Sequence, residues 1–278
     1  MKTKLPLAPT RCGGVEFRWG ERTYVMGVLN VTPDSFSGDG VGDDIEAALA
    51  QAKRLADEGA DIIDVGGEST RPGSAPVSAD EEIRRVVPVI EVLAGELSVP
   101  LSIDTYKSVV ASEAIKAGAS MINDVWGLKQ DPDLARVAAE AGVPIVLASY
   151  LQGSVRGDIL AAVIADLERG IKQATEAGVA GQNIIIDPGI GFGKSVAQNM
   201  ELIRRLGELS SLGRPILLGT SRKFMVGLPF DQRLEATAAT VAIAIAHGAD
   251  MVRVHDVRQM VQVCRMSDVI VRGEQGGN

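Results

Sequence analysis

Polar side chains directly follow seven of the eight short apolar runs in this sequence. The third, fourth and sixth runs are followed by a carboxylate or a carboxamide, at Asp104, Asn123 and Asp187. Such short side chains hold hydrogen-bonding groups at fixed positions, which suits a flat heterocycle with several N–H donors. Any one of them could instead cap a helix or a turn, but seven at equivalent positions favour a binding site.

Residues that can carry positive charge form a second set. Arg71 and Lys223 follow the second and seventh runs, and Arg253 and His255 lie in and just after the last run. Arginine offers a planar fork of donors that matches phosphate oxygens. His255 stands beside Arg253, which favours anion binding, whereas His247 precedes a glycine and fits a structural role. Together the two sets predict a ligand with a nitrogenous ring joined to a phosphorylated arm.

The glycine-rich segment 189–195 (GIGFGKS) is similar to two nucleotide-binding motifs but matches neither. The first glycine of a P-loop would fall on Pro188, and Lys194 stands where a dinucleotide fingerprint has its third glycine. We therefore expect neither ATP nor NAD there. The segment predicts a turn after the sixth run, with Phe192 either lining the site or belonging to the core.

Eight apolar runs of strand length alternate with segments of helical period. The runs cover residues 24–29, 61–65, 100–103, 120–122, 144–147, 184–186, 215–218 and 251–254. Glycines that can end a helix precede several runs, at Gly59, Gly118, Gly142, Gly178 and Gly248. Apolar strands separated by amphipathic helices are typical of a parallel sheet covered by helices, with functional groups beyond the carboxyl ends of the strands. The pattern predicts an α/β protein with a single (β/α)8 TIM barrel, and an open doubly wound sheet is the alternative.

No change of composition divides the chain, which favours one domain. We expect a short N-terminal extension or cap over residues 1–22, with a hairpin strand at 15–19, the barrel over 23–273 and a disordered tail over 274–278. The net charge of −8, without any basic run, argues against nucleic acid as a partner. No apolar stretch approaches the roughly 20 residues of a membrane helix. Only Cys12 and Cys264 are present, which favours a reducing cytoplasm over a disulfide framework.

The segments at the strand ends, in this order, resemble the dihydropteroate synthase family. The resemblance rests on residues 27–37 (GVLNVTPDSFS), 64–73 (DVGGESTRPG), 102–105 (SIDT), 122–124 (IND), 187–194 (DPGIGFGK), 220–223 (TSRK) and 253–256 (RVHD). It extends from about Val25 to Ile270. The first two segments are highly specific to the family.

The resemblance implies a TIM barrel that condenses 6-hydroxymethyl-7,8-dihydropterin pyrophosphate with 4-aminobenzoate, giving 7,8-dihydropteroate and pyrophosphate by an SN1-like displacement. The implied catalytic residues are Lys223, Asp104, Asp187 and Arg253, and the implied pterin-binding residues are Asp104, Asn123, Asp187, Lys223 and Arg253. The implied pyrophosphate-binding residues are Asn30, Arg71, Arg253 and His255, with Asn30 as the ligand of Mg²⁺. The implied aminobenzoate-binding residues are Thr70, Pro72, Ser221, Phe36 and Phe192. A homodimer is implied as well.

Two segments depart from the family pattern. After the fifth run the family has Met-His, whereas this chain has 147–153 (LASYLQG), where Tyr150 could replace the missing contact with the pterin. The connection after Lys223 is shorter than usual, which raises the possibility of a sulfonamide-tolerant variant. Two alternatives to the synthase remain: a pterin-binding paralogue without catalysis, and a pterin methyltransferase that serves a corrinoid.

Overall fold

Eight parallel strands form the centre of the computed structural model, which describes residues 7–32, 44–69, 75–151, 155–223, 229 and 232–273. The strands are β3 (Tyr24–Asn30), β4 (Ile62–Gly66), β5 (Leu101–Asp104), β6 (Met121–Asp124), β7 (Ile145–Ala148), β8 (Ile184–Asp187), β9 (Leu217–Leu218) and β10 (Met251–Val254). Each overlaps one of the eight runs predicted from the sequence. Neighbours pair in the order β8-β7-β6-β5-β4-β3-β10-β9.

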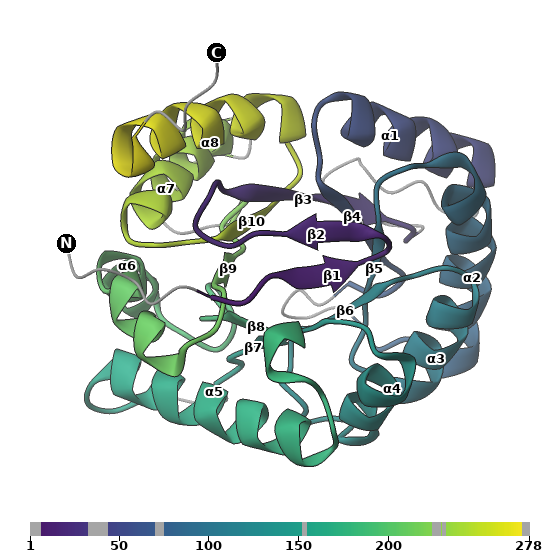
Figure 1. Ribbon diagram of the computed structural model, residues 1–278, viewed down its shortest axis with the longest axis horizontal. Coiled ribbons are helices and arrows are strands. Elements are labelled where there is room, and N and C mark those ends of the chain that lie inside the picture. Colours follow the sequence, from purple (N-terminus) through teal and green to yellow (C-terminus); the bar gives the residue numbers. More distant parts are fainter. Residues whose placement is uncertain are drawn as a thin grey trace.

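The sheet closes into a barrel rather than staying open. A parallel bridge between Ile186 and Ile216 joins the two ends of the strand order, and the amide of Ile186 donates to the carbonyl of Pro215. Helices surround the strands in a ring (Figure 1). They are α1 (Ile45–Asp57), α2 (Ala79–Glu96), α3 (Ser108–Lys116), α4 (Asp133–Ala141), α5 (Ile159–Glu176), α6 (Val196–Arg204), α7 (Arg233–Ala246) and α8 (Val257–Arg272), with short 3₁₀ turns at Gly181–Asn183 and Leu206–Leu212. The predicted (β/α)8 barrel is confirmed.

Alternation along the strands divides the barrel interior into layers, because successive side chains of a strand point to opposite faces. One layer is apolar and comprises Met26, Ile62, Met121, Val146, Ile185, Leu217 and Met251. Two residues further along the strands, the same face presents Asp64, Asn123, Asp187 and Arg253. The register of the strands therefore places a polar layer directly above an apolar one, toward the carboxyl ends.

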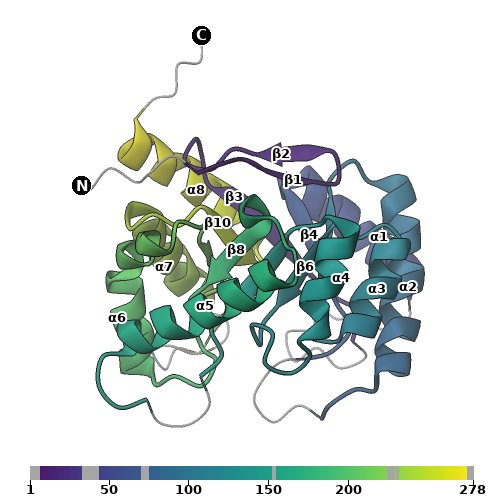
Figure 2. The same ribbon diagram turned by 60° about the horizontal axis from the view of Figure 1, so that its bottom comes forward.

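A hairpin covers the amino-terminal end of the barrel (Figures 1 and 2). Its strands are β1 (Thr10–Cys12) and β2 (Val15–Phe17), which pair antiparallel. Phe17 packs edge-on against Tyr24 at the start of β3, with ring centroids 4.8 Å apart, and Trp19 lies 5.5 Å from the same ring. Of the predicted hairpin strand at 15–19, the structure has Val15–Phe17 as a strand, and the hairpin closes the end of the barrel opposite the polar layer.

Helix ends follow the predicted chemistry. The five predicted helix-ending glycines have φ between +68° and +121°: Gly59, Gly118, Gly142, Gly178 and Gly248. Ser195 begins α6 with a capping box, in which its hydroxyl accepts from the amide of Gln198 and the Gln198 side chain accepts from the amide of Ser195. Of the helices that the structure describes, none has the length and apolar character needed to cross a membrane.

Several predictions concern residues outside the described ranges. These are the aminobenzoate residues Phe36, Thr70 and Pro72, the pyrophosphate residue Arg71, and the tail 274–278.

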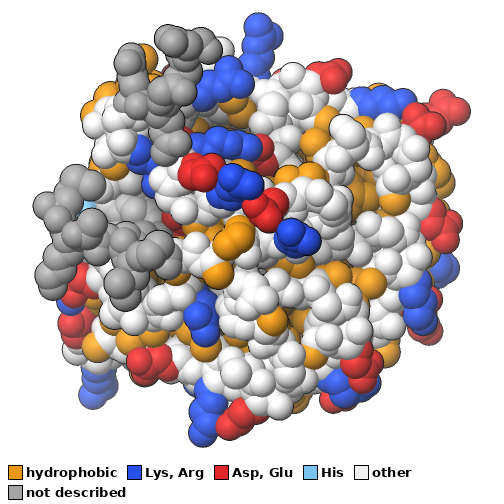
Figure 3. All heavy atoms as spheres, viewed as in Figure 1, with side chains coloured by type: hydrophobic (Ala, Val, Ile, Leu, Met, Phe, Trp, Pro, Cys, Tyr) orange, Lys and Arg blue, Asp and Glu red, His pale blue; other side chains and the backbone are white. Residues whose placement is uncertain are grey.

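The hairpin face of the molecule shows lysine and arginine side chains close to aspartate and glutamate side chains (Figure 3). This mixing agrees with the interspersed charges of the sequence.

Candidate active site

An ion-pair cluster forms the centre of the polar layer. Arg253 on β10 donates from Nε to Asp64 Oδ2 at 2.6 Å and from Nη2 to Asp104 Oδ2 at 2.6 Å. Asn123 on β6 donates from Nδ2 to the same oxygen of Asp64 at 2.8 Å. Asp64, on β4, has no exposed surface, and Asn123 and Asp104 are buried. Four strands thus contribute to one network of charge-assisted hydrogen bonds.

Two carboxylate oxygens of this cluster are buried and unpaired. Oδ1 of Asp64 and Oδ1 of Asp104 accept no hydrogen bond from the residues that the structure describes. A buried acceptor without a donor is costly, so each oxygen is suited to an N–H group of a ligand. Burial raises the pKa of Asp104 to about 7, although Arg253 lowers it, and the charge of Asp64 adds to the increase.

Lys223 and Asp187 lie on the other side of Arg253. A Cβ atom at Gly219 would be 3.8 Å from Lys223 Nζ and 3.9 Å from both Asp187 Oδ2 and Arg253 Cβ. The three side chains therefore converge at the end of β9, where glycine leaves space. Burial lowers the pKa of Lys223 to about 8 against the attraction of Asp187, and burial raises the pKa of Asp187. Burial disfavours the charge on Arg253, but Asp64 and Asp104 outweigh it and raise the pKa of the guanidinium.

A hydrogen-bonded pair lies after β9 and β10. Ser221 Oγ is 2.9 Å from His255 Nδ1 and accepts from the His255 amide at 3.1 Å. On the β3–β4 side, a Cβ atom at Gly66 would lie 3.8 Å from Asn30 Oδ1 and 3.7 Å from Asp104 Oδ2. Asn30 therefore faces the same end of the barrel as the carboxylate cluster.

The segment after β8 is a tight turn, as predicted. Gly189, Gly191 and Gly193 have φ of +68°, +84° and +67°, a conformation that favours glycine. Lys194 donates to the carbonyls of Phe192 and Gly189 inside the turn, at 3.1 and 2.9 Å, and to the carbonyl of Ser149 after β7 at 2.6 Å. These three bonds explain why this lysine is not available to a nucleotide phosphate. The Phe192 ring lies 4.4 Å from Lys223 Nζ and is only half-buried, so it borders the site rather than the core.

The structure thus brings together Asp104, Asn123, Asp187, Lys223 and Arg253, with Asn30, Ser221, His255 and Phe192 at the same end. Asp64 was not among the predicted site residues. Its signal was a carboxylate inside the run 61–65 (DIIDV), at a position whose side chain points into the barrel. Trp126, which no motif marks and which stacks on Tyr150, was not predicted either.

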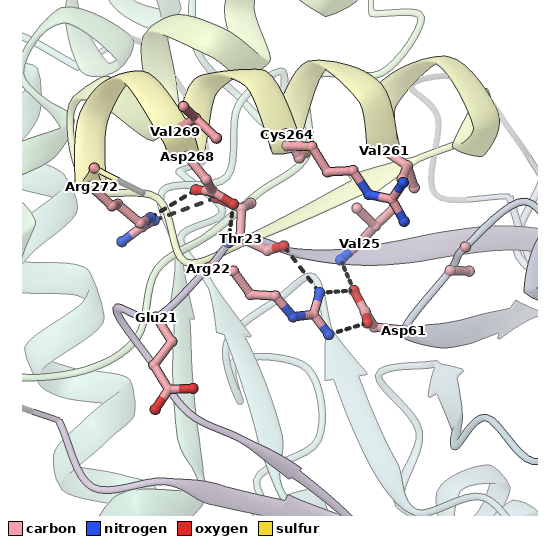
Figure 4. Close-up of a pocket in the computed structure, with 14 residues that line it drawn as sticks. Glu21, Arg22, Thr23, Val25, Asp61, Val261, Cys264, Asp268, Val269 and Arg272 are labelled. Atoms are coloured by element: carbon pink, nitrogen blue, oxygen red, sulfur yellow. Dashed lines mark hydrogen bonds and ion pairs between the residues drawn. The ribbon is translucent and has the colours of Figure 1, made fainter. Parts of the chain in front are cut away.

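A hollow of about 780 Å³ lies at the opposite end of the barrel, between α8 and the start of β3 (Figure 4). Four of its charged groups form two ion pairs, Arg22 with Asp61 and Arg272 with Asp268. Arg22 donates twice to Asp61, at 2.6 and 3.0 Å, and Asp268 accepts from the amide and hydroxyl of Thr23 at 2.7 and 2.8 Å. These contacts fasten α8 to the barrel wall far from the polar layer.

The family of the chain follows from comparison with known proteins. A family model described as "Pterin binding enzyme" matches residues 26–255. A dihydropteroate synthase of Clostridium beijerinckii is 51% identical over 267 residues, which cover 94% of this chain and 99% of that protein. The chain belongs to the dihydropteroate synthase family. The resemblance seen in the strand-end motifs is therefore confirmed.

Solved structures of other dihydropteroate synthases share the fold. The Yersinia pestis enzyme with a sulfonamide drug complex aligns with a TM-score of 0.90 and 37% identity, covering 96% of this chain and all of that one. The Xanthomonas albilineans enzyme in complex with 7,8-dihydropteroate aligns with a TM-score of 0.85 and 40% identity, covering 95% and 98% of the two chains. Over nearly its whole length, this chain therefore has the fold of solved dihydropteroate synthases.

Proposed function

We propose that this chain condenses 6-hydroxymethyl-7,8-dihydropterin pyrophosphate with 4-aminobenzoate, releasing pyrophosphate and forming 7,8-dihydropteroate. The observation that carries the proposal is the pair of buried, unpaired carboxylate oxygens on Asp64 and Asp104 at the active end of the barrel. A pterin presents several N–H donors in one plane and would supply what these acceptors lack.

Pterin recognition falls to Asp104, Asn123, Asp187, Lys223 and Arg253. The carboxylates accept from ring N–H groups, and Lys223 donates to a ring acceptor. The Asn123 carboxamide can donate to one ring atom and accept from another. Arg253 is held in place by its two carboxylate partners and presents its planar guanidinium to the ring. As the bond to the pyrophosphate lengthens, positive charge develops on the pterin methylene, and the anionic Asp104 and Asp187 stabilise it.

Pyrophosphate binding involves Asn30, Arg71, Arg253 and His255. Magnesium fits this end of the site, because it binds oxygen atoms, keeps several waters and usually takes few protein ligands beside substrate phosphates. Asn30 Oδ1 is such an oxygen; nowhere in the described ranges do three His, Cys, Asp or Glu side chains form a metal-binding group. A bound Mg²⁺ would neutralise charge on the leaving pyrophosphate.

The aminobenzoate would lie beside Ser221 and Phe192, together with Phe36, Thr70 and Pro72. An arylamine is a weak neutral nucleophile, so the site gains more from stabilising the leaving group than from activating the amine. This reasoning supports an SN1-like displacement without a covalent enzyme intermediate. The site contains carboxylates suited to a developing cation, which agrees with that order of events.

The test is release of pyrophosphate by the purified chain with both substrates and Mg²⁺. Lys223→Met should abolish turnover, while Lys116→Met, at a lysine two-thirds exposed on α3, is the matched control. Calorimetry with the dihydropterin pyrophosphate alone then separates binding from catalysis. Binding without pyrophosphate release would contradict the synthase and support a pterin-binding paralogue without catalysis. The role of Asn30 in holding Mg²⁺ is tested with inorganic pyrophosphate, which in the presence of Mg²⁺ should bind more weakly to Asn30→Ala than to the parent chain.

The assembly, location and domain limits are further proposals. We infer a homodimer through α7 and α8, where Ile243, Met266, Val269 and Ile270 are the large exposed apolar side chains. Sedimentation should give twice the mass of the chain, and Met266→Lys with Ile270→Lys should give single chains.

Buried free thiols at Cys12 and Cys264 support a cytoplasmic location. The limits 1–22 and 23–273 remain predictions that limited proteolysis would test.

A further inference from the structure

Four aromatic rings lie side by side along the carboxyl-terminal edge of the barrel, on the connections that follow β5 to β8. The rings of Trp126 and Tyr150 are stacked, with centroids 3.8 Å apart and planes inclined by 17°. Tyr150 stacks in turn on Phe192 at 5.5 Å and 30°, and Tyr106 meets Trp126 edge-on at 6.3 Å. At the other end, the Phe192 ring faces Lys223 Nζ at 4.4 Å. The row of rings therefore ends on a predicted pterin-binding lysine.

Backbone contacts hold the connections that carry these rings close together. A Cβ atom at Gly127 would be 2.5 Å from the carbonyl oxygen of Ala148, and one at Gly193 would be 1.5 Å from that of Leu151. Only glycine permits such approaches. The segment with Tyr150 is thus clamped between the turns that carry Trp126 and Phe192, which explains how three rings from distant parts of the sequence can stack.

Hydrogen bonds also fix the backbone of Trp126 and of Phe192, the residues whose rings lie on either side of Tyr150. The carboxylate of Asp124 accepts from the amide of Trp126 at 2.8 Å. The amide of Phe192 donates to the carbonyl of Gly189 at 3.1 Å, and its carbonyl accepts from Lys194. The orientation of the Phe192 ring about its side-chain bonds is left to packing, and its stacking partner is Tyr150.

We propose that Trp126 and Tyr150 are positioning residues that hold the Phe192 ring against the Lys223 ammonium and thereby set the affinity for the pterin. The inference rests on the proposed function, since Lys223 acts on the pterin there. The Lys223 ammonium lies beside Asp187 and Arg253, and the Phe192 ring covers one side of it. The Cδ atom of Lys223 would be 3.1 Å from a Cβ atom at Gly191, so the aliphatic part of the side chain is packed against this glycine. The ammonium also donates to the carbonyl of Ile190, and a displaced ring would let it pivot about that hydrogen bond, away from the ligand.

The test compares substitutions that keep bulk but remove the flat ring. Tyr150→Leu should raise the dissociation constant for the dihydropterin pyrophosphate about three- to tenfold, the range expected for one aromatic pair. Tyr150→Phe keeps the ring and should restore the affinity of the parent chain. Tyr106→Leu is the matched control, because this ring lies at the far end of the row from Lys223, and its dissociation constant should change less than twofold.

A double-mutant cycle decides whether Tyr150 acts through Phe192. In the Phe192→Leu background, Tyr150→Leu should weaken pterin binding no further, although near-ultraviolet circular dichroism and the thermal midpoint should show that both variants are folded. A full additional loss in that background would overturn the proposal, because Tyr150 would then act on the pterin directly. Unchanged affinity of Tyr150→Leu would overturn it as well. If the parent chain bound no pterin, the proposed function itself would fail, which is a separate outcome.

Discussion

Asp64→Asn tests the electrostatic core of the site with a change of charge and almost none of shape. Oδ2 of Asp64 accepts from Arg253 and Asn123, at 2.6 and 2.8 Å, and an amide oxygen can keep both bonds. A hydrogen bond to a charged group contributes about 1.5–3 kcal/mol and a neutral one about 0.5–1.5 kcal/mol. The bond from Arg253 stays charged on the arginine side, so the lost charge should cost about 1–1.5 kcal/mol in holding Asn123. The new NH2 group also takes the place of the unpaired Oδ1 and cannot accept from a ring N–H. Pterin binding should weaken at least about five- to tenfold.

The same substitution should also change the pH dependence of binding. Asp104 must be anionic to accept from ring N–H groups, so binding falls as pH decreases through its pKa of about 7. The charge of Asp64 contributes to that raised pKa, and removing it should move the acidic limb of pterin binding to lower pH. Calorimetric titration of the dihydropterin pyrophosphate between pH 5.5 and 9, at intervals of roughly half a unit, measures both effects at once.

The matched control is Asp61→Asn, directly before β4 at the opposite end of the barrel. Asp61 also accepts from an arginine, Arg22, and from the backbone amide of Val25. Its loss should lower the free energy of unfolding slightly and leave pterin binding unchanged over the whole pH range. Equal effects of the two substitutions on pterin affinity, or no effect of Asp64→Asn, would refute the role of Asp64 in pterin binding.

Three further predictions concern the turn after β8, the pH profile and a helix cap. Gly193→Ala should lower the free energy of unfolding by at least about 3 kcal/mol, because a Cβ atom there would be 1.5 Å from the carbonyl oxygen of Leu151. The control is Gly20→Ala, where φ is +90° but the space is open, and it should cost only about 1–2 kcal/mol. Urea titration compares the two variants. In the parent chain, the plot of kcat/KM against pH should be bell-shaped with its maximum between pH 7 and 8, because the pKa of Asp104 is about 7 and that of Lys223 about 8. A flat profile from pH 6 to 9 would contradict these roles. Ser195→Ala should lower the free energy of unfolding by about 1 kcal/mol and leave the pterin dissociation constant unchanged; a change in that constant would place α6 in the binding site.

The sequence allowed the barrel and much of the site to be predicted because both follow from local periodicity. Period-two alternation and the carboxyl ends of parallel strands place Asp104 and Asp187 at the same edge, and each is the last residue of its strand. The strand boundaries were accurate to within two residues. The difference of two residues at the start of β9, predicted from Pro215 and observed from Leu217, has a physical reason, since proline lacks the amide that would extend the ladder.

Other features depend on contacts between segments that no local pattern records. Asp64 lies within a strand rather than at its end, so it is not among the polar residues that follow the apolar runs. The stacking of Trp126 on Tyr150 depends on the conformation of two connections and on the glycines that let them touch. Neither residue type nor spacing indicates that rings 24 positions apart in the chain lie face to face.

The charges of the polar layer explain why the site needs two distinct regions. When all are ionised, the layer holds three carboxylates, on Asp64, Asp104 and Asp187, against two cations, on Lys223 and Arg253. This small negative excess, shielded from solvent, stabilises ring N–H donors and a cationic methylene but repels phosphate. The pyrophosphate should therefore lie at the edge of the layer, between Arg253 and the residues Asn30 and His255, with further positive charge supplied there. Separation of the two regions also favours bond cleavage, because the developing cation and the departing anion are each stabilised where they form.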